Sequence, residues 1–304
     1  MNEEFDAEKF RILVDRAHAA HDDMQIDKTL DLLEEAYNMH QEPELNHFVT
    51  AVLLDDGQNQ LAQQIADEFV DSYANDRQLA EQYLAIAFNN RNYLQAREFA
   101  LSTRWSDEFT TIIGYEEHQG KIELGETIQT IARHFWHLSD QDVATQQARI
   151  DEAEHLPLAD YLKGAKFVLR DPFLHPIVRV TVLNRLRRLQ VNEPIIMHWL
   201  RDTEITVNPS ELVEFEEQPA FQAILQILNE HANNSDVAVN EAVLAGLRLT
   251  LLQTYPLVDK VVTDPASWVQ ATIAEVSGDT DIDEPNQQRE WRLELQKLAM
   301  DLLA

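Results

Sequence analysis

Four short segments in the first half of the chain each begin a helical pattern directly after a turn, and each ends in a small or short side chain. The segments are Gln25–Thr29, Gln58–Ala62, Asn92–Ala96 and Lys121–Gly125, and their last residues are spaced 33, 34 and 29 positions apart. The turns before them fall at Met24, Gly57, Arg91 and Gly120. Glycine at two of these positions suits the end of a helix that reverses into an antiparallel partner. The spacing predicts stacked helix pairs that pack closely through their small residues.

This spacing resembles the tetratricopeptide repeat (TPR), a helix-turn-helix of about 34 residues in which small side chains let the two helices interlock. The third repeat matches best, because "LAEQYLAIAFNNRNYLQAREFA" places Asn92 and Tyr93 at the turn and Ala96 and Ala100 on the second helix. The strict consensus Trp, Leu-Gly and Tyr are missing from the first helices, and the fourth repeat is degenerate and short. The resemblance covers about residues 6–138, and its alternative is a generic helical bundle.

The second half continues as helices without a clear period, apart from one short β-rich stretch. We expect helices at 158–170, 177–189, 219–232, 236–253, 265–276 and 286–303, with a further one beginning at Asn208 and Pro209. The segments "IIMHWL" and "EITV" flank Arg201–Thr203 and predict a small hairpin near 195–207. Residues 172–276, with "FLHPIVRVTVLNRLRRLQ" and "EITVNPSEL", resemble the region that follows the repeats in cytosolic TPR proteins of Gram-positive bacteria, a likeness that implies architecture alone.

The predicted fold class is therefore all-α. Residues 1–138 are expected to form a TPR-like right-handed helical solenoid, an α-α superhelix. Residues 139–304 are expected to form a helical C-terminal region that contains the hairpin.

Composition limits the classes of partner. The chain has 24 Lys and Arg against 54 Asp and Glu, a net charge of −30, which repels nucleic acid and anionic membrane surfaces. It has no cysteine, which excludes disulfides and thiolate sites. Its N-terminus is acidic where a signal peptide would be basic and then apolar, so we expect a cytoplasmic protein.

Motifs for catalysis, cofactors and metals are weak. The seven glycines are never closer than five residues apart, so no phosphate-binding loop is predicted. No nucleophile elbow and no His-Glu-x-x-His pair occurs. His18 with His21 and His134 with His137 lack a third metal ligand. Asp279, Asp281, Asp283 and Glu290 match calcium-loop positions, but Glu284 replaces the glycine that the turn requires. We expect no metal, no cofactor and no enzymatic activity.

The family resemblance implies a concave groove lined by the first helices of the repeats, which binds a peptide or protein segment. Carried onto this chain, the groove positions are Arg11, His18, His21, His47, Gln78, Glu81, Asn89, Glu117 and His118. Histidines near carboxylates hold their protons more firmly, so the groove is expected to become less negative as the pH falls. The predicted partner segment is basic, and either helical or extended.

One segment departs from the acidic composition. Residues 163–190 carry seven basic side chains and one acidic side chain. This basic segment comprises Lys163, Lys166, Arg170, Arg179, Arg185, Arg187 and Arg188. Its guanidinium and ammonium groups either bind an acidic partner or phosphate, or pair with carboxylates of the same chain, and we favour the second interpretation.

The leading functional hypothesis is a non-enzymatic scaffold or adaptor that binds a protein segment. One alternative is a peptide-sensing regulator of the TPR type, although repeats that begin near Met1 leave no space for a preceding DNA-binding module. The other is an enzyme with an unrecognised site in the C-terminal half. Sequence leaves the oligomeric state open.

Overall fold

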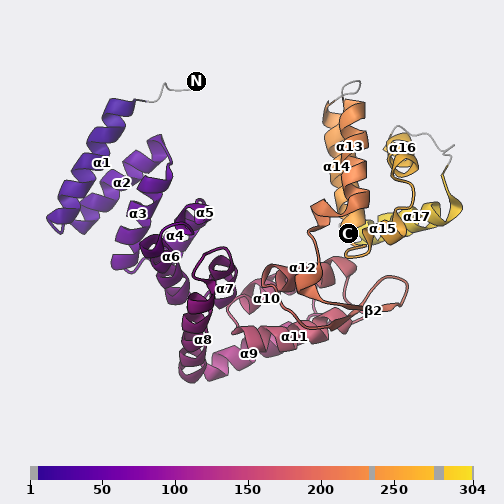
Figure 1. Ribbon diagram of the computed structural model, residues 1–304, viewed down its shortest axis with the longest axis horizontal. Coiled ribbons are helices and arrows are strands. Elements are labelled where there is room, and N and C mark those ends of the chain that lie inside the picture. The colour runs from indigo at the N-terminus through magenta and orange to yellow at the C-terminus, as the bar shows by residue number, and fades with distance from the viewer. Residues whose placement is uncertain (1–5, 233–236, 277–283, 303–304) are drawn as a thin grey trace. The chain divides into compact units, whose positions relative to one another are not determined.

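The computed structural model describes residues 6–232, 237–276 and 284–302, and it confirms an all-α fold with one small hairpin (Figure 1). The chain divides into two compact units. The first comprises Met1–Ile131 with Asp151–Tyr161, and the second comprises Ala132–Ile150 with Leu162–Ala304. The expected boundary at residue 138 lies close to this division but does not foresee the return of 151–161 to the first unit.

The first unit is a helical solenoid. Its helices are α1 (Ala7–Asp22), α2 (Ile26–Met39), α3 (Pro43–Asp55), α4 (Asn59–Asp67), α5 (Val70–Tyr73), α6 (Arg77–Asn89), α7 (Tyr93–Leu101) and α8 (Ser106–Glu123). Successive helices pack against each other from α1 to α4, and α6, α7 and α8 do likewise. The next helices, α9 (Gly125–Trp136), α10 (Val143–Ala153) and α11 (Leu158–Arg170), each belong partly to both units.

Three turns of the first unit share one backbone arrangement. Met24, Gly57 and Arg91 end α1, α3 and α6 in the left-handed conformation, with φ of 58°, 77° and 58°. After each one, the next residue donates its N–H to a carbonyl five residues earlier, at 2.9, 2.9 and 2.8 Å. This is the Schellman arrangement, which satisfies carbonyls at a helix end. The predicted turn positions are confirmed at these three places.

The predicted small residues of the second helices are also confirmed in three of the four repeats. Thr29, Ala62 and Ala96 each lie five residues after the left-handed position, and each is completely buried. The α1–α2, α3–α4 and α6–α7 pairs form the close helix contacts that such residues permit.

The expected turn at Gly120 is wrong. α8 continues through Gly120 to Glu123, and α9 begins at Gly125 after Leu124. A Cβ at Gly120 would lie 2.1 Å from the hydroxyl of Tyr93, so glycine is needed there for the close approach of α7. Gly125 has no neighbour within 4 Å of such a Cβ and is not a packing position. The short fourth spacing arose from this misplaced turn.

The second unit contains α12 (Pro176–Arg188), β1 (Ile195–His198), β2 (Glu204–Val207), α13 (Pro219–Ala232), α14 (Val237–Leu252), α15 (Val258–Val261), α16 (Pro265–Val276) and α17 (Asn286–Asp301). The expected long helices are found within two residues of their predicted bounds. In the core of this unit α13 packs against α14 and α16, and α14 packs against α17.

The hairpin is antiparallel, with Ile195 opposite Val207 and His198 opposite Glu204. Arg201 and Asp202 at its tip have φ of 54° and 53°, two positive angles within the loop Trp199–Thr203 that joins the strands. The helix expected from Asn208 is wrong. Pro209–Glu211 form a single 3₁₀ turn, and the chain is extended at Leu212. The next carbonyl, that of Val213, accepts a hydrogen bond from the Tyr255 hydroxyl at 2.8 Å.

Replacing Ala96 by leucine should overpack the α6–α7 contact and lower the free energy of unfolding by about 1–3 kcal/mol. Ala96 has no exposed surface into which the larger side chain could turn. Urea titration followed by circular dichroism measures the loss. Ala19→Leu, at an exposed position of α1, is the matched control and should change stability by less than about 0.5 kcal/mol. Equal losses would contradict the packing role of Ala96.

Candidate functional site

A cluster of rings joins the first helices of the first two repeats. His18 of α1 stacks on Phe48 of α3, with ring centroids 4.1 Å apart and planes within 7° of parallel. His21 meets the same phenyl ring edge-on at 5.5 Å. His18 is exposed, and His21 and Phe48 are half-buried. The structure therefore brings these two predicted groove residues together around a phenylalanine that sequence reasoning did not select.

His47, the predicted groove residue of the second repeat, is more enclosed. Its Nε2 lies 2.7 Å from the Ser72 hydroxyl, and its ring lies 4.4 Å from the ring of Tyr73. Burial lowers the pKa of His47, and the weaker attraction of Glu44 and Asp76 does not reverse this shift. The expectation that nearby carboxylates strengthen proton binding is therefore wrong for His47, because desolvation of the imidazolium outweighs them.

Five further predicted groove residues are exposed on α1, α6 and α8, namely Arg11, Gln78, Glu81, Asn89 and His118. Glu81 is engaged within its own helix, where it accepts a hydrogen bond from Arg77 at 2.9 Å. Arg77 also forms an ion pair with Glu108 of α8. This pair links α6 and α8, the first helices of the third and fourth repeats, at the surface.

Glu117 does not line a groove, which corrects the prediction for this residue. Its carboxylate accepts two hydrogen bonds from Arg97 of α7, both at 2.7 Å, and a third from the backbone of Leu158 at the start of α11. The side chains of Arg97 and Glu117 are only 15% and 10% exposed. Glu117 thus fastens α7 and α11 to α8. Its spacing from buried Phe109, Ile113 and Gly120 is helical, a signal that could have marked it as inward-facing.

A polar cluster that sequence reasoning missed is centred on α3 and joins it to α2, α4 and α5. Asn46, fully buried on α3, donates to the Tyr37 hydroxyl at 2.9 Å and to the carbonyl of Ile65 at 2.6 Å. It accepts from the Tyr73 hydroxyl at 2.6 Å, which also contacts Thr50. These bonds satisfy the buried polar atoms and fix α2, α3, α4 and α5 in one arrangement.

The basic segment does not form one continuous patch. Lys166 pairs with Glu193 at 2.9 Å, Arg170 with Glu204 at 3.4 Å and Arg187 with Glu214 at 2.7 Å. Lys163 lies 4.6 Å from the ring centroid of Trp136. Arg179 is buried and donates to the carbonyls of Asp171 and Leu174, so it is not a surface group. Arg185 and Arg188 complete the predicted set, and both also have interaction partners.

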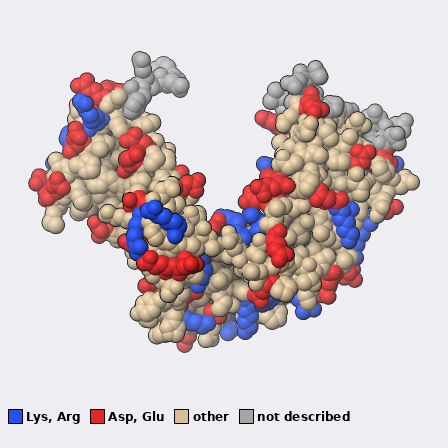
Figure 2. All heavy atoms as spheres, in the orientation of Figure 1, with Lys and Arg blue, Asp and Glu red and all other residues tan. Residues whose placement is uncertain are grey.

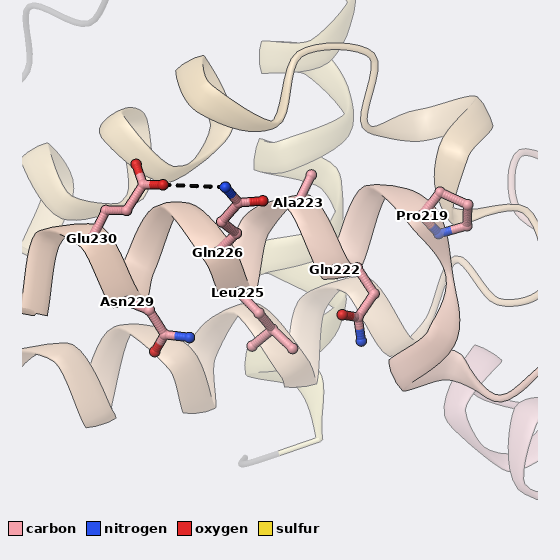
Figure 3. A pocket seen from close by; sticks show the side chains of 7 residues that line it. All are labelled: Pro219, Gln222, Ala223, Leu225, Gln226, Asn229 and Glu230. Atoms are coloured by element: carbon pink, nitrogen blue, oxygen red, sulfur yellow. Dashed lines mark hydrogen bonds between the residues drawn. The ribbon is translucent and has the colours of Figure 1, made fainter.

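The hollows in the second unit bring few polar side chains from different elements together. Arg187 and Arg188 line one with Glu214, Phe215 and Tyr255. Another follows the exposed face of α13 and is lined by Pro219, Gln222, Ala223, Leu225, Gln226, Asn229 and Glu230 (Figure 3). All of its lining residues come from one helix, and Gln226 is already bonded to Glu230 at 3.2 Å. On the face drawn in Figure 2, acidic and basic side chains are interspersed over both units.

The calcium-loop pattern lies mostly outside the described residues, since these exclude Asp279, Asp281 and Asp283. Glu284 is described, and it binds the buried guanidinium of Arg292 on α17. Glu290 is exposed on the same helix. Across the described ranges, no three His, Asp or Glu side chains group as metal ligands. Within the same ranges, no helix combines the length and apolar character needed to cross a bilayer.

Comparison with known proteins gives one partial relative. The TPR repeat-containing protein YsoA of Bacillus subtilis (strain 168) is 26% identical over 106 residues, which are 35% of this chain and 31% of that protein. The match therefore spans about a third of the length of this relative. No family model matches the chain, and no solved structure matches it. The resemblance to TPR proteins of Gram-positive bacteria agrees with this relative.

Replacing Glu117 by glutamine should lower the free energy of unfolding by about 3–5 kcal/mol, because it leaves the Arg97 charge buried without a counterion. Glu123→Gln is the matched control on the same helix. It breaks the exposed pair with Arg91, at 3.1 Å, and should cost less than about 1 kcal/mol. Chemical denaturation measures both variants, and similar losses would contradict the structural role of Glu117.

The lowered pKa of His47 makes the folded state bind a proton less readily than the unfolded state, whose histidine has the ordinary value of 6.5. Stability should therefore fall as the pH drops below about 6.5. His47→Gln removes this titration and should reduce the loss of thermal stability between about pH 7.5 and pH 5. Melting temperatures measured across that pH range test this prediction. It is contradicted if the melting temperature of His47→Gln falls with pH as steeply as that of the parent protein.

Proposed function

We propose that this chain is a non-enzymatic adaptor that binds a peptide or protein segment along the exposed faces of the first helices of its repeats. The observation that carries the proposal is the His18–Phe48–His21 cluster. It joins two successive first helices through ring contacts and leaves His18 open to solvent. Ring surfaces on a rigid helical framework are effective contact points for a bound segment.

The repeat architecture supports the same proposal. Solenoids display one face of each repeat in a regular row, and this arrangement suits an extended or helical ligand. The TPR-named relative supports an interaction role at the level of the family. The net charge of −30 favours a basic segment over an acidic one, nucleic acid or an anionic membrane. We propose the cytoplasm as its compartment.

Site-specific photo-crosslinking in the native cell tests where the segment binds. A photoreactive residue at Gln78 or Asn89, both exposed on the first helix of the third repeat, should capture the segment. The same residue at Asp31 or Gln60, both exposed on second helices, should not. A synthetic copy of the captured sequence should then bind the purified protein in calorimetry, more weakly as salt is added.

Two outcomes would overturn the adaptor proposal. Capture from the second-helix positions would place the contact on the wrong face. Capture of an acidic segment from Thr181, an exposed residue within the basic segment, would move binding to the second unit.

A further inference from the structure

The helix faces of α1 and α3 that carry the ring cluster also carry four carboxylates. On α1, Asp15 and Asp22 lie three residues before and four residues after His18, which places them on the same helix face. On α3, Glu44 and Asp55 lie four residues before and seven residues after Phe48. All four carboxylates are exposed.

These carboxylates have no cationic Lys or Arg partner within the described part of the chain, although Glu44 attracts His47. None of the four forms an ion pair there, whereas Lys9 of α1 pairs with Glu35 and Arg77 of α6 pairs with Glu81. Arg11 is the basic residue that belongs to the same row of α1. Four carboxylates against one guanidinium leave the ring cluster in a strongly negative field.

The second unit shows which side chain suits such a combination of ring and carboxylate. Arg201 lies with its guanidinium carbon 3.4 Å from the centroid of Trp291, and its Nε donates to Glu294 at 2.8 Å. There the ring, the carboxylate and the arginine all belong to this chain. On the α1–α3 face the rings and the carboxylates are present, and the described residues supply no stacked cation.

We propose that the α1–α3 face binds an arginine side chain of the partner segment. The planar guanidinium stacks on the exposed imidazole of His18, and its N–H groups donate to the flanking carboxylates. Lysine matches this face less well, because its ammonium group is compact and strongly hydrated and cannot stack through a flat surface. The inference rests on the proposed adaptor function and specifies the residue that the adaptor recognises.

Nuclear magnetic resonance with a defined probe tests the inference without a known partner. N-acetyl-arginine amide is titrated into the full chain, whose histidine and phenylalanine rings carry isotope labels. The ring signals of His18 and Phe48 should shift saturably. N-acetyl-citrulline amide has nearly the same shape but no charge and should produce no saturable shift, and N-acetyl-lysine amide should bind more weakly than the arginine probe.

Charge-matched variants separate a local site from general attraction to an acidic protein. Asp22→Asn with Asp55→Asn should abolish saturation by the arginine probe. Asp31→Asn with Glu34→Gln removes the same charge from exposed positions of α2 and should leave the affinity within about twofold. Melting temperatures verify folding. If the first double variant is unstable, His18→Ala, at an exposed position, replaces it and should also abolish saturation.

Three results would overturn the inference: no saturable shift, equal shifts with citrulline, or equal loss in both double variants. Its failure is distinguishable from failure of the adaptor proposal. If a captured segment crosslinks to Gln78 and Asn89 but needs no arginine for binding, the adaptor proposal stands and the arginine inference fails. If the arginine probe binds but no segment is captured in the cell, the arginine site stands and the adaptor proposal fails.

Discussion

The first unit depends on one backbone constraint, the left-handed residue that ends the first helix of each of its first three repeats. Because Met24, Gly57 and Arg91 adopt the same conformation with the same pair of hydrogen bonds, each second helix leaves its turn in the same direction. Thr29, Ala62 and Ala96, each five residues after its left-handed residue, are consequently all completely buried. Two of the three left-handed residues are not glycine, and the cost of about 1–2 kcal/mol at each is offset by the carbonyls that the turn satisfies.

Buried polar contacts add specificity to this regular packing. Asn46 and Glu117 each bring three or more segments to one side chain, which apolar residues of similar size could not do with the same directionality. Such groups are costly to bury unless every hydrogen bond is made, so they penalise alternative arrangements of the helices. The exposed ring of His18 and the half-buried ring of Phe48 therefore stand on a framework whose geometry is narrowly defined, as a binding surface requires.

Local patterns predicted local structure well, and they failed where the outcome depended on contacts between distant residues. Turn position and small-residue spacing located the helix pairs, and the short apolar, β-rich segments on either side of Arg201–Thr203 located the hairpin. Gly120 was misjudged because a glycine needed for contact with Tyr93 looks the same in sequence as a glycine needed for a turn. The groove position predicted for Glu117 comes from the family resemblance. Its helical spacing from buried Phe109 and Ile113 indicates the inward face, while its partners, Arg97 and Leu158, lie 20 and 41 residues away and leave no local signal. The same limit hid Phe48, whose importance comes from two histidines on another helix.

The ion pair between the hairpin tip and α17 has a consequence for the order in which the parts of the chain fold. Arg201 reaches Glu294 across 93 residues, and His175 reaches the carbonyl of Leu298 across 123. Neither contact can form until α17 has left the ribosome. The helix pairs α1–α2, α3–α4 and α6–α7 of the first unit, by contrast, each form their contacts within a single repeat. The repeats can therefore fold while translation continues, and the second unit completes its core only after α17 emerges.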